Sequence, residues 1–272
     1  MTTSIESIEF IRARHIARSL NEAVSCLASD DSSVVAKILE ERQFSSCPVL
    51  DAGVPIGILT AFDCQPRLTA REAMQPIGLK SVISADTFLL DAARKLLASP
   101  FQLILEGSHL TGFLTEADLG SATGKSFAYL KLAAVEVNLC KFLRRRYADE
   151  GSILSTLNEK RKFEVEGLIT NLKLSDQYID HFASLGLSDL LQIAGRQPDF
   201  KERVKQFGGW QRLTRGLPNL RNDVMHPDRP LLGQHRQLES FVEKIQNLES
   251  IQSALQMCID SDSRHGNDRF HF

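Results

Sequence analysis

One seven-residue pattern occurs twice in the chain, and it restricts the N-terminal half to a structure built from two like units. The first copy is residues 57–63 (GILTAFD) and the second is residues 112–118 (GFLTEAD), an offset of 55. The offset holds upstream without a gap, since residues 49–51 (VLD) align with residues 104–106 (ILE). A fixed offset over such a span indicates one supersecondary unit built twice.

Each unit contains the same series of local signals. An acidic or hydroxyl cluster, residues 29–31 or 84–87, precedes apolar residues at helical spacing and predicts a capped helix. Two apolar runs follow, separated by a glycine-containing turn at residues 51–53 or 106–108, and these predict a hairpin. We expect the last helix of each unit to begin at Asp63 or Asp118. The resulting order is strand, helix, strand, strand, helix.

This order, with its Gly-apolar-apolar-Thr-x-x-Asp ending, resembles the cystathionine β-synthase (CBS) domain, which occurs as a tandem pair. The resemblance covers roughly residues 20 to 120. It implies clefts for an adenosine-containing ligand, in which Asp binds the ribose hydroxyls and Thr approaches phosphate. Thr60 and Asp63 would serve one cleft, and Thr115 and Asp118 the other. A carboxylate can accept two hydroxyl protons, and an exposed helix start favours phosphate.

The same Thr and Asp side chains can instead cap the last helix of each unit, and capping and ligand binding can coexist. The candidate ligands are the adenine nucleotides AMP and ATP, S-adenosylmethionine and a cyclic dinucleotide. The motif does not distinguish among these regulatory ligands.

Length and composition indicate two domains and a soluble, cytoplasmic protein. A chain of 272 residues exceeds one typical domain, and its net charge of −2 does not indicate nucleic-acid binding by the whole surface. An RNA contact would need a local patch such as Lys141, Arg144, Arg145 and Arg146, whose simpler explanation is a solvated helix face. No apolar stretch reaches membrane-spanning length, so we expect no membrane partner.

The five cysteines are scattered and form no close pair of the kind that binds zinc, so no metal site is predicted. An odd, dispersed set of thiols fits a reducing cytoplasm. Cys47, just before a predicted strand, is expected in the core rather than as a nucleophile, because buried thiols behave as small hydrophobes.

After Asp118 the sequence becomes helical throughout. Residues 121–126 are small and polar and predict a linker capped by Ser126, whereas a phosphate loop is excluded because position 119 is Leu rather than Gly. We expect a tandem CBS module over 1–120 (an N-terminal helix, then repeats at about 20–63 and 75–118), an all-α bundle over 127–260 and a polar tail over 261–272. The predicted helices are 127 to about 150, 153–170, 187–194, 200–207, 210–215, 220–226 and 234–258.

Within the bundle, residues 221–226 (RNDVMH) place Arg221 and Asn222 before His226 with four residues between Arg and His. This pattern resembles the R-x(4 to 6)-H motif of ribonucleases in the HEPN (higher eukaryotes and prokaryotes nucleotide-binding) superfamily. Glu136, in the first helix, lies where polar residues often occur in that family. The resemblance implies RNA cleavage without metal or cofactor, a 2′,3′-cyclic phosphate product, and a homodimer whose two motifs form one composite cleft.

The residue types suit this chemistry. A neutral His can take a proton from a ribose 2′-hydroxyl, and Arg can hold the phosphate whose charge grows during attack. Asn222 and His226 are one helical turn apart, and Pro227 should end the helix just beyond His226. The alternative is structural: Arg221 and Asn222 would bond to neighbouring helices, and His226 would cap a helix C-terminus.

Two hypotheses therefore remain. In the first, a homodimeric sensor and effector uses a CBS pair to bind an adenine nucleotide and to control a HEPN-like, metal-independent endoribonuclease that acts on RNA. In the second, the protein is a non-catalytic CBS regulator whose helical domain serves for dimerisation or partner docking. A third possibility, that the chain is a regulatory subunit of a metabolic enzyme, has no catalytic signature in the sequence to support it.

Overall fold

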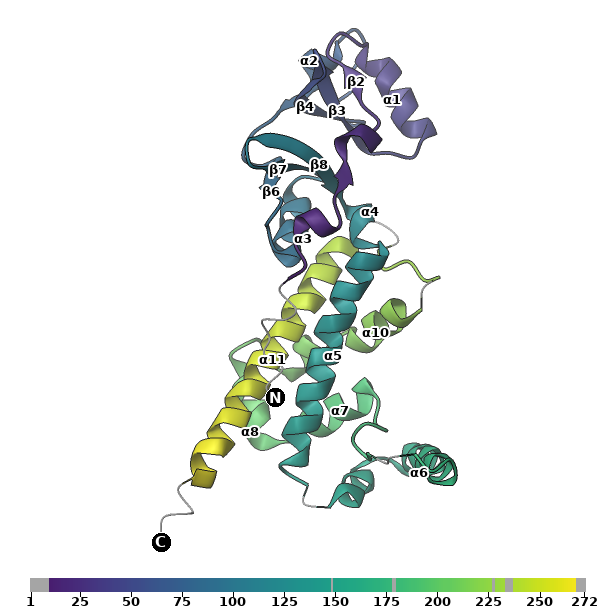
Figure 1. Ribbon diagram of the computed structural model, residues 1–272, viewed down its shortest axis with the longest axis vertical. Helices are drawn as coiled ribbons and strands as arrows, with labels where there is room; N and C mark the ends of the chain where they lie inside the picture. The colour runs from purple at the N-terminus through teal and green to yellow at the C-terminus, as the bar shows by residue number, and fades with distance from the viewer. Residues whose placement is uncertain (1–9, 148, 178–179, 227, 233–236, 268–272) are drawn as a thin grey trace. The chain divides into compact units, whose positions relative to one another are not determined.

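The structure is a computed structural model that describes residues 10–147, 149–177, 180–226, 228–232 and 237–267. It divides into two compact units, the first containing residues 1–127 and 230–242 and the second residues 128–229 and 243–272. The chain passes between the units within α5 (Ala122–Arg144), between residues 229 and 230, and within α11 (Gln237–Asn267) (Figure 1). As the sequence predicts, the first unit is α+β and the described part of the second is helical.

Two four-stranded sheets form the first unit, with strand orders β2-β3-β4-β5 and β1-β8-β7-β6. The first sheet consists of β2 (Cys26–Leu27), β3 (Ser46–Asp51), β4 (Val54–Thr60) and β5 (Gln75–Pro76). The second consists of β1 (Arg18–Ser19), β8 (His109–Thr115), β7 (Phe101–Glu106) and β6 (Val82–Ser84). The helices of this unit are α1 (Ser32–Glu41), α2 (Ala70–Ala73), α3 (Leu89–Ala98) and α4 (Glu116–Leu119).

The 55-residue repeat is exact in the hairpins. β7 and β8 begin and end 55 residues after β3 and β4, and the register shifts at Val49/Leu50 and at Ile104/Leu105. Each turn uses left-handed backbone, with φ of 80° at Gly53 and 60° at Gly107. Glycine adopts this conformation without a Cβ penalty. The two glycines are not equivalent positions of the repeat, because Gly107 corresponds to Ala52, whose φ is 46°.

The repeated motif glycines lie where a distant segment approaches the hairpin. β5 pairs with β4 at Gly57, and β1 pairs with β8 at Gly112. A Cβ at Gly112 would lie 2.5 Å from the carbonyl oxygen of Arg18. A Cβ at Gly57 would lie 2.9 Å from that of Gln75. The segment that precedes each repeat therefore closes the hairpin of the other repeat.

Helix starts differ between the repeats. Asp31 caps α1 by accepting a hydrogen bond from the Ser33 amide at 2.8 Å, as predicted. The prediction of a polar cap for the second repeat is wrong: α3 follows Phe88, which provides no side-chain cap. The guanidinium of Arg12 lies 3.5 Å from the Phe88 ring centre instead, so the N-terminal segment packs on this helix start.

The last helix of each repeat also differs. α4 begins at Glu116, two residues before the predicted start at Asp118, and no helix begins at Asp63. α2 begins only at Ala70, because Thr69 and Glu72 form a capping box there. The predicted N-terminal helix is not found in the described residues 10–25, which form two 3-10 turns, η2 (Ala13–His15) and η3 (Leu20–Glu22), around β1.

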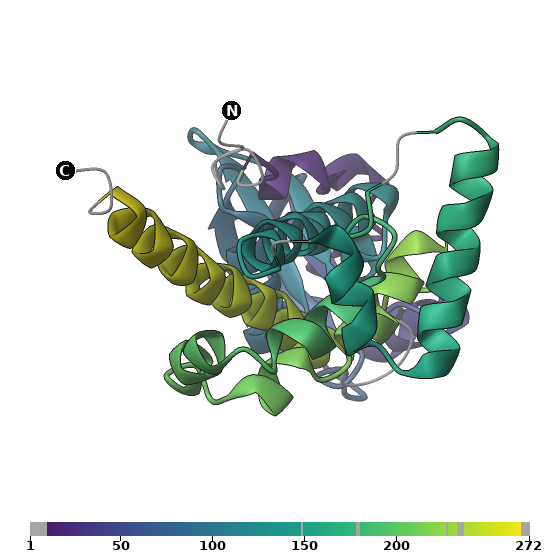
Figure 2. The same ribbon diagram turned by 90° about the horizontal axis from the view of Figure 1, so that it is seen from below.

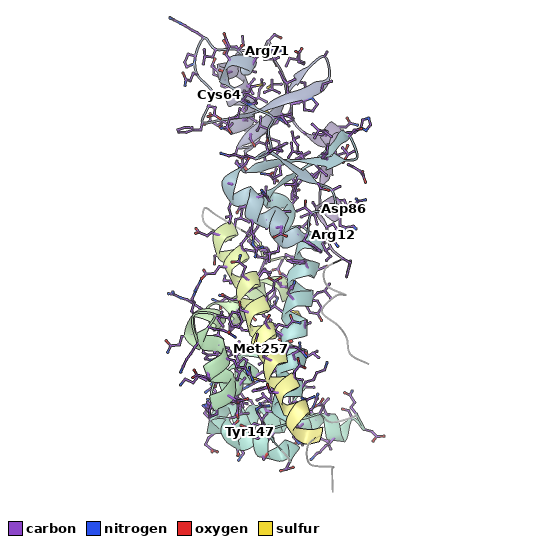
Figure 3. The ribbon with its side chains drawn as sticks, turned by 90° about the vertical axis from the view of Figure 1, so that its left-hand side faces the viewer. Arg12, Cys64, Arg71, Asp86, Tyr147 and Met257 are labelled. Carbon is purple, nitrogen blue, oxygen red and sulfur yellow. The ribbon has the colours of Figure 1, made fainter. Side chains whose placement is uncertain are left out.

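The N-terminal segment binds the second repeat through its arginines. Arg12 donates to the Asp86 carbonyl oxygen at 3.3 Å, and the two residues lie next to each other in Figure 3. Arg14 forms ion pairs with Asp86 at 2.7 Å and with Glu106 at 3.0 Å. These contacts hold the segment that leads into β1.

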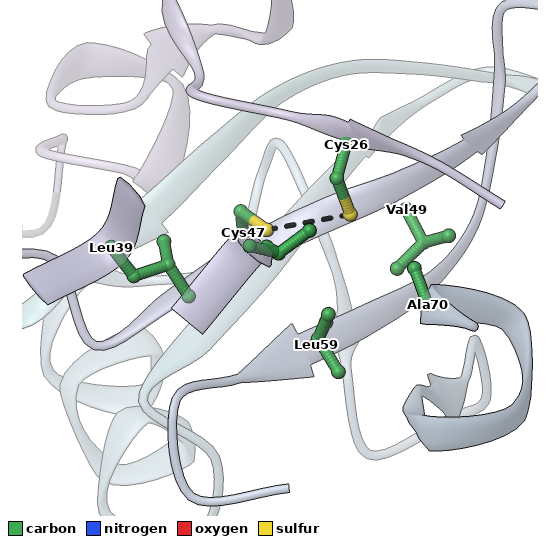
Figure 4. Packing of buried hydrophobic residues seen from close by; sticks show 7 residues of the cluster. Cys26, Leu39, Cys47, Val49, Leu59 and Ala70 are labelled. Carbon is green, nitrogen blue, oxygen red and sulfur yellow. Dashed lines mark hydrogen bonds between the residues drawn. The ribbon is translucent and has the colours of Figure 1, made fainter. Parts of the chain in front are cut away.

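The core of the first repeat contains two thiols. Cys47 is 1% exposed and lies 3.7 Å from Cys26, sulfur to sulfur, among Leu39, Val49 and Leu59 (Figure 4). Its hydrogen bond to Cys26 and its burial raise the pKa of Cys47. The expectation of a core cysteine is confirmed.

We therefore expect Cys47 to react with iodoacetamide at least about tenfold more slowly than the partly exposed Cys64 in the folded protein, because reaction requires an accessible thiolate. Mass spectrometry after timed labelling measures both rates, and labelling in urea gives the unfolded reference. Equal labelling rates for Cys47 and Cys64 in the folded protein would contradict the burial of Cys47.

Among the described residues, the second unit consists of helices. Besides α5 and α11 these are η4 (Glu150–Thr156), α6 (Glu159–Leu174), α7 (Leu187–Ala194), α8 (Pro198–Lys205), α9 (Trp210–Thr214) and α10 (Leu217–Met225). α5 and α11 run side by side in the same direction (Figure 1), joined by an ion pair between Lys131 and Glu249 at 2.8 Å. Phe142, Phe200 and Trp210 form an aromatic core, with successive ring centres 5.2 and 5.3 Å apart.

Several boundaries in this half differ from prediction. Most of the predicted linker 121–126 belongs to α5, and Ser126 bonds back to the Ala122 carbonyl instead of capping. Gly124 permits this, because a Cβ there would lie 2.0 Å from the Leu119 carbonyl oxygen. α5 ends at Arg144 rather than near residue 150, and Asn158 caps a separate α6. α11 continues to Asn267, through the first residues of the predicted tail, whereas residues 268–272 lie outside the described range.

Within the described residues, no helix combines the length and the apolarity that crossing a bilayer requires.

Candidate functional site

The Thr and Asp of each repeated motif are bonded to one another. In the first repeat, the Thr60 hydroxyl donates to Asp63 Oδ2 at 2.7 Å, and Gln75 Nε2 donates to the same oxygen at 3.0 Å. In the second, the Thr115 hydroxyl and amide each donate to Asp118 Oδ2 at 2.8 Å. Arg18 Nε donates to Asp118 Oδ1 at 2.6 Å.

Arg18 and Gln75 occupy equivalent places in the two sheets. Each lies on the short closing strand, opposite the residue that follows the motif glycine, and each bonds to the motif Asp. The Asp118 side chain is 3% exposed. Its carboxylate caps α4 and holds the Arg18 side chain through their ion pair. The capping interpretation is thus satisfied at Asp118, and a ribose could reach its oxygens only if Arg18 moved.

A cleft of about 220 Å³ lies beside the second motif. Its lining mixes hydroxyls, aromatic rings and charges drawn from four separate stretches of chain. The lining residues include Arg18, Glu22, Phe44, Ser45, Ser46, Phe101, Phe113, Thr115 and Glu116. Thr115 lines this cleft, and Asp118 is not among its lining residues.

The cleft has an apolar wall and one cation. The rings of Phe101 and Phe113 stack with centres 5.1 Å apart and planes 4° apart, and Phe44 is 46% exposed. Arg18 is the cation of the lining, with the carboxylates of Glu22 and Glu116 as its anions. The aromatic wall can receive a flat apolar ring system, and Arg18 is the one side chain of the lining that could pair with an anionic group. The sequence motif pointed to Thr115 but not to Arg18 or Phe44, which follow no local pattern.

The solved structures to which the N-terminal part of the chain is similar are CBS-domain pairs. The CBS domains of a transcriptional regulator from Streptococcus pneumoniae are 16% identical, over 40% of this chain and 97% of that one, with a TM-score of 0.35. The CBS domain of a bacterial CNNM/CorC family Mg2+ transporter, in complex with ATP, is 17% identical over 42% and 88%, with a TM-score of 0.36. CBSX2 in complex with AMP is 19% identical over 42% and 97%, with a TM-score of 0.37.

No protein-family model and no curated protein matches the chain. The fold of the first unit is accordingly established by its own strand order, helix placement and 55-residue register.

The second candidate site lies in the helical unit, at the end of α10. Arg221 Nε donates to Glu136 Oε1 of α5 at 2.8 Å, with side-chain exposures of 38% and 28%. Asn222 and His226 are exposed. The structure thus brings Glu136 to Arg221, across 85 residues of sequence, and leaves none of the three motif side chains buried.

The end of α10 differs from prediction. The helix ends at Met225, and His226 is its C-cap with φ −102° and ψ 109°, already extended. Its amide donates to the Asn222 carbonyl at 3.1 Å. This bond keeps His226 one helical turn from Asn222, and Pro227 lies outside the described residues.

The basic cluster on α5 is engaged within the second unit. Arg144 pairs with Asp180 and Arg146 with Asp199, and Arg145 donates to the Ile259 carbonyl at 2.7 Å. Burial opposes ionisation of Asp199, but the Arg146 guanidinium outweighs it and lowers the Asp199 pKa. These arginines hold the helices together, which disfavours a phosphate-binding patch here.

Among the described residues, no group of three or more His, Cys, Asp or Glu side chains could hold a metal ion.

Proposed function

We propose that the first unit is a sensor that binds an adenosine-containing ligand in the cleft beside Thr115. The observation that carries the proposal is the cleft itself: the repeated motif, an exposed aromatic ring and one positioned arginine line a single opening. The CBS resemblance of the two motifs supplies the ligand class. We propose that the protein acts as a regulator. Thr60 and Asp63 are the residues of the first repeat that correspond to Thr115 and Asp118.

The lining suggests how such a ligand would lie. Phe44 offers its ring to the adenine, and the hydroxyls of Ser45, Ser46 and Thr115 can bond to ribose or phosphate. Asp118 engages Arg18 through Nε, and the structure gives the two terminal amino groups of Arg18 no partner among the described residues. We infer that these groups bind the phosphate while Asp118 holds the side chain in place. A direct bond from Asp118 or Asp63 to ribose remains a proposal that requires displacement of Arg18 or Gln75.

Arg18→Ala should weaken AMP binding about 10- to 100-fold and leave adenosine binding unchanged, since a hydrogen bond to a charged group contributes about 1.5 to 3 kcal/mol. Titration calorimetry on the full chain measures both ligands. Arg14→Ala is the matched control, because Arg14 belongs to the same segment but does not line the cleft.

Binding of none of AMP, ATP, S-adenosylmethionine or a cyclic dinucleotide to the folded wild-type chain would overturn the proposed ligand class. Equal loss of AMP and adenosine in Arg18→Ala would instead remove the assignment of the phosphate to Arg18.

A second candidate function concerns the helical unit, which we propose as a metal-independent endoribonuclease acting through Arg221, Asn222 and His226. The supporting observation is that Asn222 and His226 are exposed and that Arg221 is positioned by Glu136 instead of being covered by other helices. His226 would take the 2′-hydroxyl proton, and Arg221 would leave Glu136 to hold the phosphate. The alternative is a non-catalytic docking module, favoured by the use of Arg221 in an ion pair.

We further propose that two copies form a homodimer, as both family resemblances imply, and that ligand in the first unit biases the second. Such coupling requires different ligand affinities for two conformations of the protein. Five unpaired thiols support a reducing, cytoplasmic location.

A further inference from the structure

Helix α6 carries an exposed apolar stripe on the side that faces away from its own unit. Val165 and Ile169 are buried and attach the helix to the second unit. Phe163 and Leu174 are 79% and 81% exposed, and with Gly167 and Thr170 they recur at intervals of four, three and four residues. This interval places all four on one helix face, opposite the buried one. Figure 2 shows α6 at the edge of the second unit, in teal-green.

The helix is firmly held in this position. Arg161 forms ion pairs with Asp189 of α7 at 2.9 Å and with Glu164 at 3.0 Å. Asn158 caps the helix by accepting from the Arg161 amide at 2.9 Å. The exposed stripe is therefore a feature of a docked, capped helix and not of a frayed one.

We propose that this stripe is a dimerisation surface, and that its occupant is α6 of a second copy of this chain, packed antiparallel about a twofold axis. The stripe is self-complementary in size. With the axis at its centre, Phe163 lies against the partner's Leu174, and Gly167 against the partner's Thr170. Small residues at the centre let the helices approach closely, and large apolar residues cover both ends.

Charge supports the same arrangement. Glu166 and Lys173 flank the stripe on the same side, seven residues apart, and neither has an ion-pair partner among the described residues. About a twofold axis each Glu166 meets the partner's Lys173, because like flanks face one another in an antiparallel pair. A parallel pair would place the two copies of Glu166 on opposite sides of the contact, because unlike flanks face one another there. The antiparallel arrangement therefore forms two Glu166–Lys173 ion pairs.

The contact is small, so its affinity should be modest. A helix of 16 residues is about 24 Å long, and two such helices bury an area at the low end for specific interfaces. We expect dissociation on the order of micromolar, with the apolar ends contributing most. The inference depends on no ligand or catalytic assignment.

Light scattering with size-exclusion chromatography at protein concentrations from 1 to about 200 µM tests the surface. Wild type should be dimeric at the upper end, and Phe163→Asp and Leu174→Asp should each weaken dimerisation about tenfold or more. Glu166→Lys and Lys173→Glu should each weaken it about two- to tenfold, and the double variant should restore it. Asp in place of Val137, an exposed apolar residue of α5, is the control and should change nothing.

Disulfide trapping fixes the orientation. In the antiparallel pair, Cα atoms of the two copies of residue 170 are offset by only about 4.5 Å along the helix, and those of residue 174 by about 16 Å. Thr170→Cys should therefore cross-link under mild oxidation, and Leu174→Cys and wild type should not. A wild-type monomer at 200 µM, dimers unaffected by Phe163→Asp, or cross-linking of Leu174→Cys would each overturn the proposal.

Discussion

His226→Ala is expected to lower the rate of RNA cleavage by about 10² to 10⁴, the contribution of a positioned general base. His226 is exposed at the end of α10, so its loss removes no core contact and should leave the fold intact. Gel analysis of single-stranded and structured RNA, in chelator and with and without adenine nucleotide, measures the rate. Thermal melting and sizing show that the variant remains folded and keeps its oligomeric state.

Two further variants sharpen this prediction. Arg221→Ala should also abolish cleavage, because it removes the cation proposed for the phosphate. His109→Ala, which removes another exposed histidine from β8, should cleave like wild type. Equal cleavage by wild type and His226→Ala would assign the activity to a contaminant and leave the docking-module hypothesis standing.

Gly112→Ala is expected to destabilise the first unit by about 1 to 3 kcal/mol, the usual cost of overpacking a close contact. The new Cβ would lie 2.5 Å from the Arg18 carbonyl oxygen, so β1 must move away from β8. That movement also separates Arg18 from Asp118, and leaving a buried carboxylate without its charged partner costs more than 1 kcal/mol in addition. Urea denaturation monitored by circular dichroism measures the difference in free energy of unfolding.

Gly78→Ala is the matched control for this effect. No atom lies within 4 Å of a Cβ added at Gly78, and its φ is not in the left-handed region. We therefore expect a change within about 0.5 kcal/mol, as for other surface substitutions. Equal stability of the Gly112 and Gly78 variants would show that β1 does not depend on the close approach at Gly112.

The hairpins could be predicted from sequence because their determinants are local. Apolar runs of strand length flank a glycine-containing turn, and the 55-residue offset doubles the evidence for each boundary. The closing strands β1 and β5 have no such signal. They are two residues long, and their pairing depends on a partner far along the chain.

The same distinction explains the sites. The repeat points to Thr115, but Arg18, which lines the same cleft, is 97 positions away and follows no local pattern. The Arg221 to His226 motif is visible in the sequence alone, as is Glu136, but only the fold brings Glu136 to Arg221 at 2.8 Å. The helix end at Met225 does not follow from residue spacing, because helix ends vary by one or two residues.

Amide chemical-shift mapping of the full chain during titration with AMP reports both whether the ligand binds and where. We expect the largest shifts at Ser45, Ser46, Thr115 and Glu116, which line the cleft, and smaller shifts in Arg18→Ala at equal ligand concentration. No shifts at saturating AMP, or shifts confined to residues outside this lining, would show that AMP does not bind in this cleft.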